Sequence, residues 1–159
     1  MRIFPLVAIS AAALLLGCSR MQPVPLPFKP VADVKQMMDM LVDPAADVFW
    51  SESGEVVTAA GVEQRGPKSS EEWTKVQDNA MLLAESGNLL MMSPRAQDND
   101  QWMKSAQALV DTGQEAYQAA QAKDVNRMFA VGGDLYDTCL HCHQLYMPAI
   151  RDALKALNK

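Results

Sequence analysis

Apolar residues recur at helical rather than strand spacing through most of this 159-residue chain. From Trp73 to Leu90 and again from Trp102 to Ala120 they return every three or four positions. Strand-forming residues are scarce, with only three isoleucines and four threonines. A chain of this length can bury the core of one domain. We therefore expect an all-α fold, most simply an antiparallel four-helix bundle over residues 31–159.

Local signals mark where these helices begin and end. The first is expected from 31 to about 51, and Pro44 inside it either kinks the helix or starts a second one capped by Asp43. A glycine-containing loop is expected over 54–66, in which only 55–59 has some strand character.

The other three helices carry their own signals. Ser69 and Glu72 form a capping box at the start of the second, and Pro94 ends it. The third starts near 99–100, and Asp124 caps the fourth, which is expected to be the C-terminal helix.

Residues 1–17 have the form of an export signal, with basic Arg2 before an apolar run too short to span a bilayer permanently. The run ends in Leu-Leu-Leu-Gly before Cys18 and resembles the lipobox of bacterial lipoproteins. That resemblance implies cleavage before Cys18 and lipidation of this cysteine. The alternative is an ordinary signal cleaved nearby, which leaves a soluble periplasmic protein. Residues 18–30 then form a proline-rich tether, a semi-rigid spacer between membrane and domain.

The densest chemistry lies in Cys139-Leu140-His141-Cys142-His143, the C-x-x-C-H signature of covalent c-type haem attachment. On a helix, positions i, i+3 and i+4 share one face. Cys139 and Cys142 could then bond the two vinyl groups of one haem while His143 reaches the iron. His141 points away. The motif therefore predicts one haem c.

Three other interpretations of the motif are open. A structural disulfide between Cys139 and Cys142 leaves His143 unexplained. A thioredoxin-like centre needs a βαβ setting that the sequence does not predict. A zinc site needs four converging ligands, and two thiols and two imidazoles within five helical residues cannot surround one ion.

A predicted four-helix fold with its haem motif in the C-terminal helix resembles the class II c-type cytochromes, the cytochrome c prime family. The resemblance covers residues 31–159. It implies that Cys139 and Cys142 are the thioether sites, that His143 is the proximal iron ligand, and that Tyr146 is the aromatic residue beyond it. The chain has Met147 where the family commonly has arginine or lysine.

The family divides by its distal haem face. One branch has a first-helix methionine as the sixth iron ligand and resembles an electron carrier. The other has an apolar blocking side chain and binds nitric oxide or carbon monoxide. Among the first-helix methionines, Met38 lies ~30° from the centre of the apolar face, closer than Met37 or Met40. Met38 is therefore our candidate distal ligand. A direct alignment instead places Leu41 at the blocking position.

The charge balance bears on partners. A net charge of −5 argues against nucleic-acid binding. No histidine outside the motif is present to act as a catalytic acid or base, so we do not expect an enzyme.

We expect periplasmic redox partner proteins, a membrane contact through the lipid anchor and, from the resemblance, a homodimer. Arg95 and Arg127 are expected at the solvated surface, or paired with haem propionates. The remaining alternative is a haem-free helical lipoprotein that acts as a scaffold.

Overall fold

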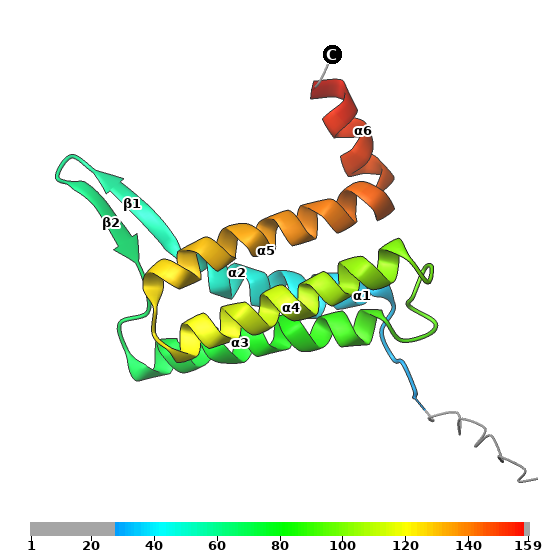
Figure 1. Ribbon diagram of the computed structural model, residues 1–159, viewed down its shortest axis with the longest axis horizontal. Helices are drawn as coiled ribbons and strands as arrows, with labels where there is room; N and C mark the ends of the chain where they lie inside the picture. The colour runs from blue at the N-terminus through cyan, green and yellow to red at the C-terminus, as the bar shows by residue number, and fades with distance from the viewer. Residues whose placement is uncertain (1–27, 158–159) are drawn as a thin grey trace, which may run out of the picture.

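The computed structural model describes residues 28–157 (Figure 1). Over this range the chain is mostly helical and contains one two-stranded sheet, which confirms the expected all-α class in its coarse form. The export signal predicted for 1–17 and the lipidation site predicted at Cys18 lie outside the described residues. Within that range, no helix combines the length and the apolar character needed to cross a membrane.

The first helical segment consists of three consecutive parts: α1 (Val34–Met37), a π-helical turn η1 (Met38–Val42) and α2 (Asp43–Ser51). The segment begins three residues later than expected because Asp33 caps it. The Asp33 carboxylate accepts a hydrogen bond from the Gln36 backbone N–H at 2.8 Å, and the Gln36 side chain accepts one from the Asp33 N–H at 3.0 Å. This capping box fixes where α1 starts.

Pro44 accounts for the π-helical turn. A proline has no backbone N–H, and its ring collides with the carbonyl four residues earlier, here that of Met40, in a regular α-helix. The chain widens instead, and the Asp43 N–H bonds to the Met38 carbonyl, five residues back. A new α-helix does start at this point, but the prediction that Asp43 caps it is wrong. Val42 occupies the cap position, and no side chain bonds there.

The segment expected to be a loop contains a β-hairpin, β1 (Gly54–Thr58) and β2 (Gly61–Arg65). Its turn is closed by Thr58, whose hydroxyl donates to the Gly61 carbonyl at 3.1 Å. Gly61 has φ 136°, a conformation that glycine adopts without steric cost. The hairpin projects from the helical body at the end opposite α6 (Figure 1).

Helix α3 (Ser70–Leu90) starts at the predicted capping box. The Glu72 N–H donates to Ser69 Oγ at 3.1 Å, and the Ser69 N–H donates to Glu72 Oε2 at 3.0 Å. The helix ends four residues before Pro94, so the proline lies beyond its end rather than at it.

Helix α4 (Gln101–Gln121) begins after Asp100, as predicted. It packs closely against α3 because glycines lie at the contact. A Cβ atom on Gly113 would lie 2.5 Å from the backbone nitrogen of Ala84, and one on Gly87 would lie 2.6 Å from a backbone carbonyl oxygen of α4. No larger residue fits at either position without displacing backbone.

Helix α5 (Val125–Tyr146) is capped by Asp124, as predicted, with the Arg127 N–H donating to Asp124 Oδ1 at 3.0 Å. The expectation that the haem motif lies in the C-terminal helix is wrong, because a further helix, α6 (Pro148–Leu157), follows α5. Pro148 separates the two helices. It lacks an N–H, and it favours an extended conformation at the preceding Met147, which has φ −112° and ψ 98°.

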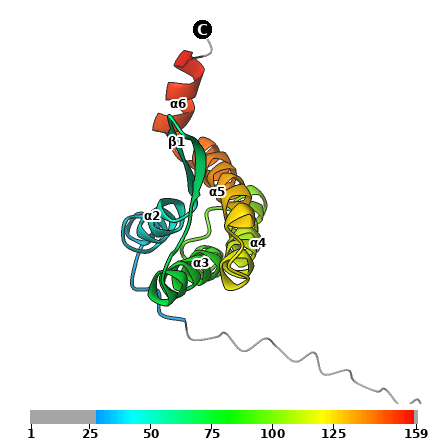
Figure 2. The ribbon, with the colours of Figure 1, turned by 90° about the vertical axis from the view of Figure 1, so that its left-hand side faces the viewer.

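The helices α2, α3, α4 and α5 lie side by side and alternate in direction along the chain (Figures 1 and 2). Contacts run from α2 to α3, from α3 to α4 and from α4 to α5. On the remaining side, α2 and α5 are joined near the hairpin, where the Trp50 indole N–H donates to the Gly132 carbonyl at 2.9 Å. The largest fully buried side chains between the helices are Phe49, Met37, Leu83, Met128, Leu135 and Val76.

Candidate functional site

The Cys139–His143 motif lies near the C-terminal end of α5. Cys139, Cys142 and His143 are half-buried, whereas His141 is exposed to solvent. This is the division that the spacing i, i+3 and i+4 predicts. Two thiols and one imidazole therefore face the interior together, and the second imidazole does not share their site.

The three inward motif residues line one cavity of about 290 Å³, which we call the inner cavity. Its walls come from η1, α2, α3, α4, α5 and α6, and they are predominantly apolar. Small-molecule sites in proteins typically enclose ~300–1,000 Å³ and combine apolar walls with a few polar groups. The inner cavity is of this kind.

A second cavity of about 350 Å³, the end cavity, lies nearer the end of α5. Met38, Cys142 and His143 line both cavities, so the two adjoin at these residues. Trp102 and Tyr146 form part of the wall of the end cavity. The two cavities give His143 open space on the side that faces η1.

The first-helix methionines have three different surroundings. Met38 is half-buried and lines both cavities. Met37 is 1% exposed in the core, and Met40 is 71% exposed to solvent. Leu41, the alternative haem-facing residue, packs against the core but is not part of the lining of either cavity. Met38 alone of these four therefore shares a cavity with His143.

Both motif cysteines are free thiols in the structure. Burial raises the pKa of the Cys139 thiol to about 11, and the carboxylate of Asp43 acts in the same direction. Burial also raises the pKa of Cys142, with the nearby Ser105 hydroxyl opposing this to a smaller extent. Thiol–disulfide enzymes need the opposite environment, one that lowers the thiol pKa. These surroundings argue against a thioredoxin-like centre.

Ser105 adds a polar group to the inner cavity. It is 6% exposed, and its hydroxyl oxygen is the one buried side-chain N or O atom without a hydrogen-bond partner within residues 28–157. Buried polar atoms normally find a partner. An unsatisfied hydroxyl beside two thiols is consistent with a cavity that holds a further group.

Tyr146 links the end of α5 to the loop before α4. Its hydroxyl donates to Asp98, and its ring packs edge-to-face on Trp102 at a centroid distance of 4.9 Å. Asp98 also accepts from the Trp102 backbone N–H at 3.0 Å. Desolvation and the Asp98 hydrogen bond raise the pKa of Tyr146 to about 12. The sequence identified Tyr146 but not Asp98, because no local signal pairs residues 48 positions apart.

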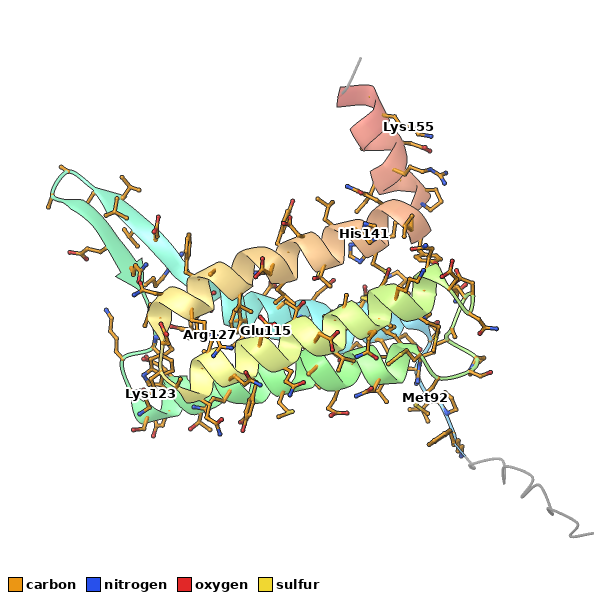
Figure 3. All side chains as sticks on the ribbon, in the orientation of Figure 1. Met92, Glu115, Lys123, Arg127, His141 and Lys155 are labelled. Atoms are coloured by element: carbon orange, nitrogen blue, oxygen red, sulfur yellow. The ribbon has the colours of Figure 1, made fainter. Side chains whose placement is uncertain are left out.

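The expected surface position of Arg95 is wrong. This side chain is 7% exposed; its Nε donates to the Ala32 carbonyl at 2.9 Å and its Nη1 to the Leu89 carbonyl at 3.1 Å. These bonds fix the start of α1 against the end of α3. Arg127 is exposed, as predicted, near the N-terminal end of α5 and away from the motif (Figure 3). Neither arginine lines the inner or end cavity.

The zinc interpretation gains no support. In the part of the chain that the structure describes, no group of three or more histidine, cysteine, aspartate or glutamate side chains is arranged to hold a metal ion.

Comparison of the chain with protein-family models, with curated proteins and with solved structures found no match in any of the three.

Proposed function

We propose that this protein is a monohaem c-type cytochrome that carries single electrons. The observation that supports the proposal most is that Cys139, Cys142 and His143 share a largely apolar cavity with Met38, which comes from a separate helical segment. Two thiols, one imidazole and one thioether are the side chains that covalent attachment and six-coordinate ligation of one haem require.

The residues of the site fit such a group. Cys139 and Cys142 would form the thioether bonds, and His143 and Met38 would supply a nitrogen and a sulfur to the iron. A bound haem c would supply a reversible one-electron iron couple. A methionine ligand raises the reduction potential of such a couple. The open space on the η1 side of His143 leaves room for a further group beside the two thiols and the imidazole.

The protein's own contribution is to hold ligands and exclude water. The inner cavity draws walls from six helical elements, which keep the motif in an apolar environment. The Asp98–Tyr146–Trp102 contacts hold the last turn of α5, which carries His143. The capping box at Asp33 and the bonds from Arg95 hold the segment that carries Met38. Ligand side chains held in place in this way would suit a carrier, since little would rearrange when one electron is exchanged.

The remaining elements of the proposal follow from the sequence. The side-by-side helices with alternating direction support an antiparallel four-helix bundle of the class II cytochrome type. We propose an exported protein on the periplasmic side of a bacterial membrane, anchored through lipid on Cys18, with periplasmic redox proteins as partners and no enzymatic activity. Homodimer formation is part of the same proposal.

The test is a redox titration of protein made together with the cytochrome c maturation machinery. The proposal predicts a reversible one-electron change and a low-spin spectrum in both oxidation states. Carbon monoxide should bind the reduced protein slowly or weakly, because Met38 must first be displaced. Rapid stoichiometric binding of carbon monoxide would instead identify a five-coordinate haem that binds carbon monoxide or nitric oxide. Absence of covalent haem would reject both functions.

A further inference from the structure

Positive charge is absent from the two stretches of chain that border the α2–α5 side of the molecule. No lysine or arginine occurs between Lys35 and Arg65, or between Arg127 and Arg151. These stretches include η1, α2 and the part of α5 that carries the motif. Asp43 and Asp47 are exposed on α2, and Asp134 and Asp137 are exposed on α5. In η1, Asp39 is neutralised by an ion pair with Lys35.

An apolar strip runs along α5 between these carboxylates. Tyr136 is 56% exposed and Phe129 is 42% exposed, and with half-buried Leu140 they follow the three- and four-residue spacing of one helix face. The Tyr136 ring packs edge-to-face on Trp50 of α2 at 6.4 Å between centroids. The strip is therefore anchored to α2, and its Tyr136 and Phe129 side chains remain exposed to solvent.

The strip leads directly to the candidate site. Tyr136, Leu140 and Trp50 line the inner cavity together with Cys139 and His143. A molecule seated on the strip would be separated from the motif only by the cavity wall. This places an exposed apolar surface where electrons would leave or enter, and surrounds it with carboxylates.

We propose that this surface, the Tyr136 strip with its rim of Asp43, Asp47 and Asp137, is the docking site for a redox protein whose own docking face carries lysines around an apolar centre. The inference rests on the proposed function. Apolar centres with charged rims are typical of protein interfaces, and complementary charge speeds encounter. Weak, steered association suits a carrier that must release its partner after each transfer.

The charges also decide against other occupants. A second copy of this chain docked through the same surface would bring the acidic rims together, and like charges across an interface are costly. An anionic membrane surface is repelled for the same reason. A cationic protein partner is the occupant that the rim attracts.

The experiment uses the matured holoprotein and, as probe, a basic mitochondrial cytochrome c. Electron transfer between the two is measured by stopped flow over a range of ionic strength. The test variant carries Asp47→Lys and Asp137→Lys. The control carries Asp78→Lys and Glu115→Lys, the same change in net charge at exposed positions on α3 and α4. We expect the test variant to react at least tenfold more slowly at low ionic strength, the control to change less than threefold, and the difference to vanish near 1 M salt, where the Debye length is ~3 Å.

Equal slowing of the two variants would overturn the proposal, because only net charge would then matter. The proposal would also be overturned if neither variant reacted more slowly than wild type. Calorimetric titration with the same basic protein measures docking without electron transfer, and equal affinities for the two variants would overturn the proposal as well. A dimer in sedimentation that is lost in Tyr136→Ser would assign the strip to a second copy instead. Failure of the proposed function is seen separately, as a missing haem spectrum before mixing.

Discussion

Met38, at the start of the π-helical turn, and His143, near the end of α5, line the same two adjoining cavities. They lie 105 positions apart in sequence and belong to separate helical segments. Pro44 contributes to this relationship, because the turn that it imposes includes Met38 itself. The Met38 thioether and the His143 imidazole, two groups that can bind iron, therefore face the same open space.

Met38→Ala tests whether this shared space reflects ligation. We expect the matured variant to change from low spin to high spin and to bind carbon monoxide rapidly when reduced. Met40→Ala is the matched control, because Met40 is 71% exposed and lines neither cavity. Absorption spectra of both oxidation states give the result. An unchanged spin state in Met38→Ala would remove Met38 from the site.

The first-helix methionines also show where sequence reasoning reaches its limit. A straight helical wheel through residues 31–51 centres the buried face near Leu41 to Ala45. Ala45 is fully buried, but Leu41 is only half-buried, while Val42 and Ala46 are at most 3% exposed. One extra residue in a π-helical turn rotates all later positions by about 100°. Pro44 can be seen in the sequence. Its effect on the later helical positions depends on whether the backbone kinks or forms a π-helical turn to avoid the collision between the proline ring and the Met40 carbonyl.

Local signals, by contrast, could be read directly. The capping box of Ser69 with Glu72 and the cap residue Asp124 are short-range hydrogen-bond patterns, and the structure has them where predicted. The inward positions of Cys139, Cys142 and His143 follow from helix geometry alone. Contacts between distant residues, such as Tyr146 with Asp98, depend on how helices pack and have no sequence signature.

The Tyr146–Asp98 hydrogen bond predicts a pH dependence of stability. Folding raises the pKa of Tyr146 from its ordinary value of about 10 to about 12, so its contribution is complete below pH 10 and is lost as the pH rises to 12. Folding lowers the pKa of Asp98, so its contribution is lost as the pH falls below the ordinary range of an aspartate. Urea unfolding from pH 9 to 12 should therefore show a steeper loss in wild type than in Tyr146→Phe. Parallel curves would contradict the bond.

The close contact between α3 and α4 predicts opposite effects for two glycine substitutions. Gly113→Ala places a methyl group 2.5 Å from the Ala84 backbone nitrogen, and such overpacking costs about 1–3 kcal/mol. Gly133→Ala, on α5, meets nothing within 4 Å and should stabilise the helix by about 0.5–1 kcal/mol. Denaturant unfolding measures both. Equal effects would contradict the packing of α3 on α4.

The buried Arg95 side chain predicts a further difference in stability. Arg95→Ala removes the side-chain donor to the Ala32 carbonyl and one of the donors to the Leu89 carbonyl, which costs about 1–3 kcal/mol. Arg127→Ala removes the same charge from an exposed side chain whose one hydrogen bond is to Gln118 at 3.3 Å, and its effect should stay within about 0.5 kcal/mol. Equal free energies of unfolding for the two variants would mean that Arg95 does not hold α1 in place.

The intact mass of the protein shows whether haem is covalently bound to Cys139 and Cys142. Wild type made with the cytochrome c maturation machinery should gain the mass of one haem, retained after denaturation in acid, and should give the pyridine haemochrome spectrum of two thioether bonds. The Cys139→Ser, Cys142→Ser double variant should gain none. A wild-type protein with the mass of the polypeptide alone would show that Cys139 and Cys142 do not bind haem covalently.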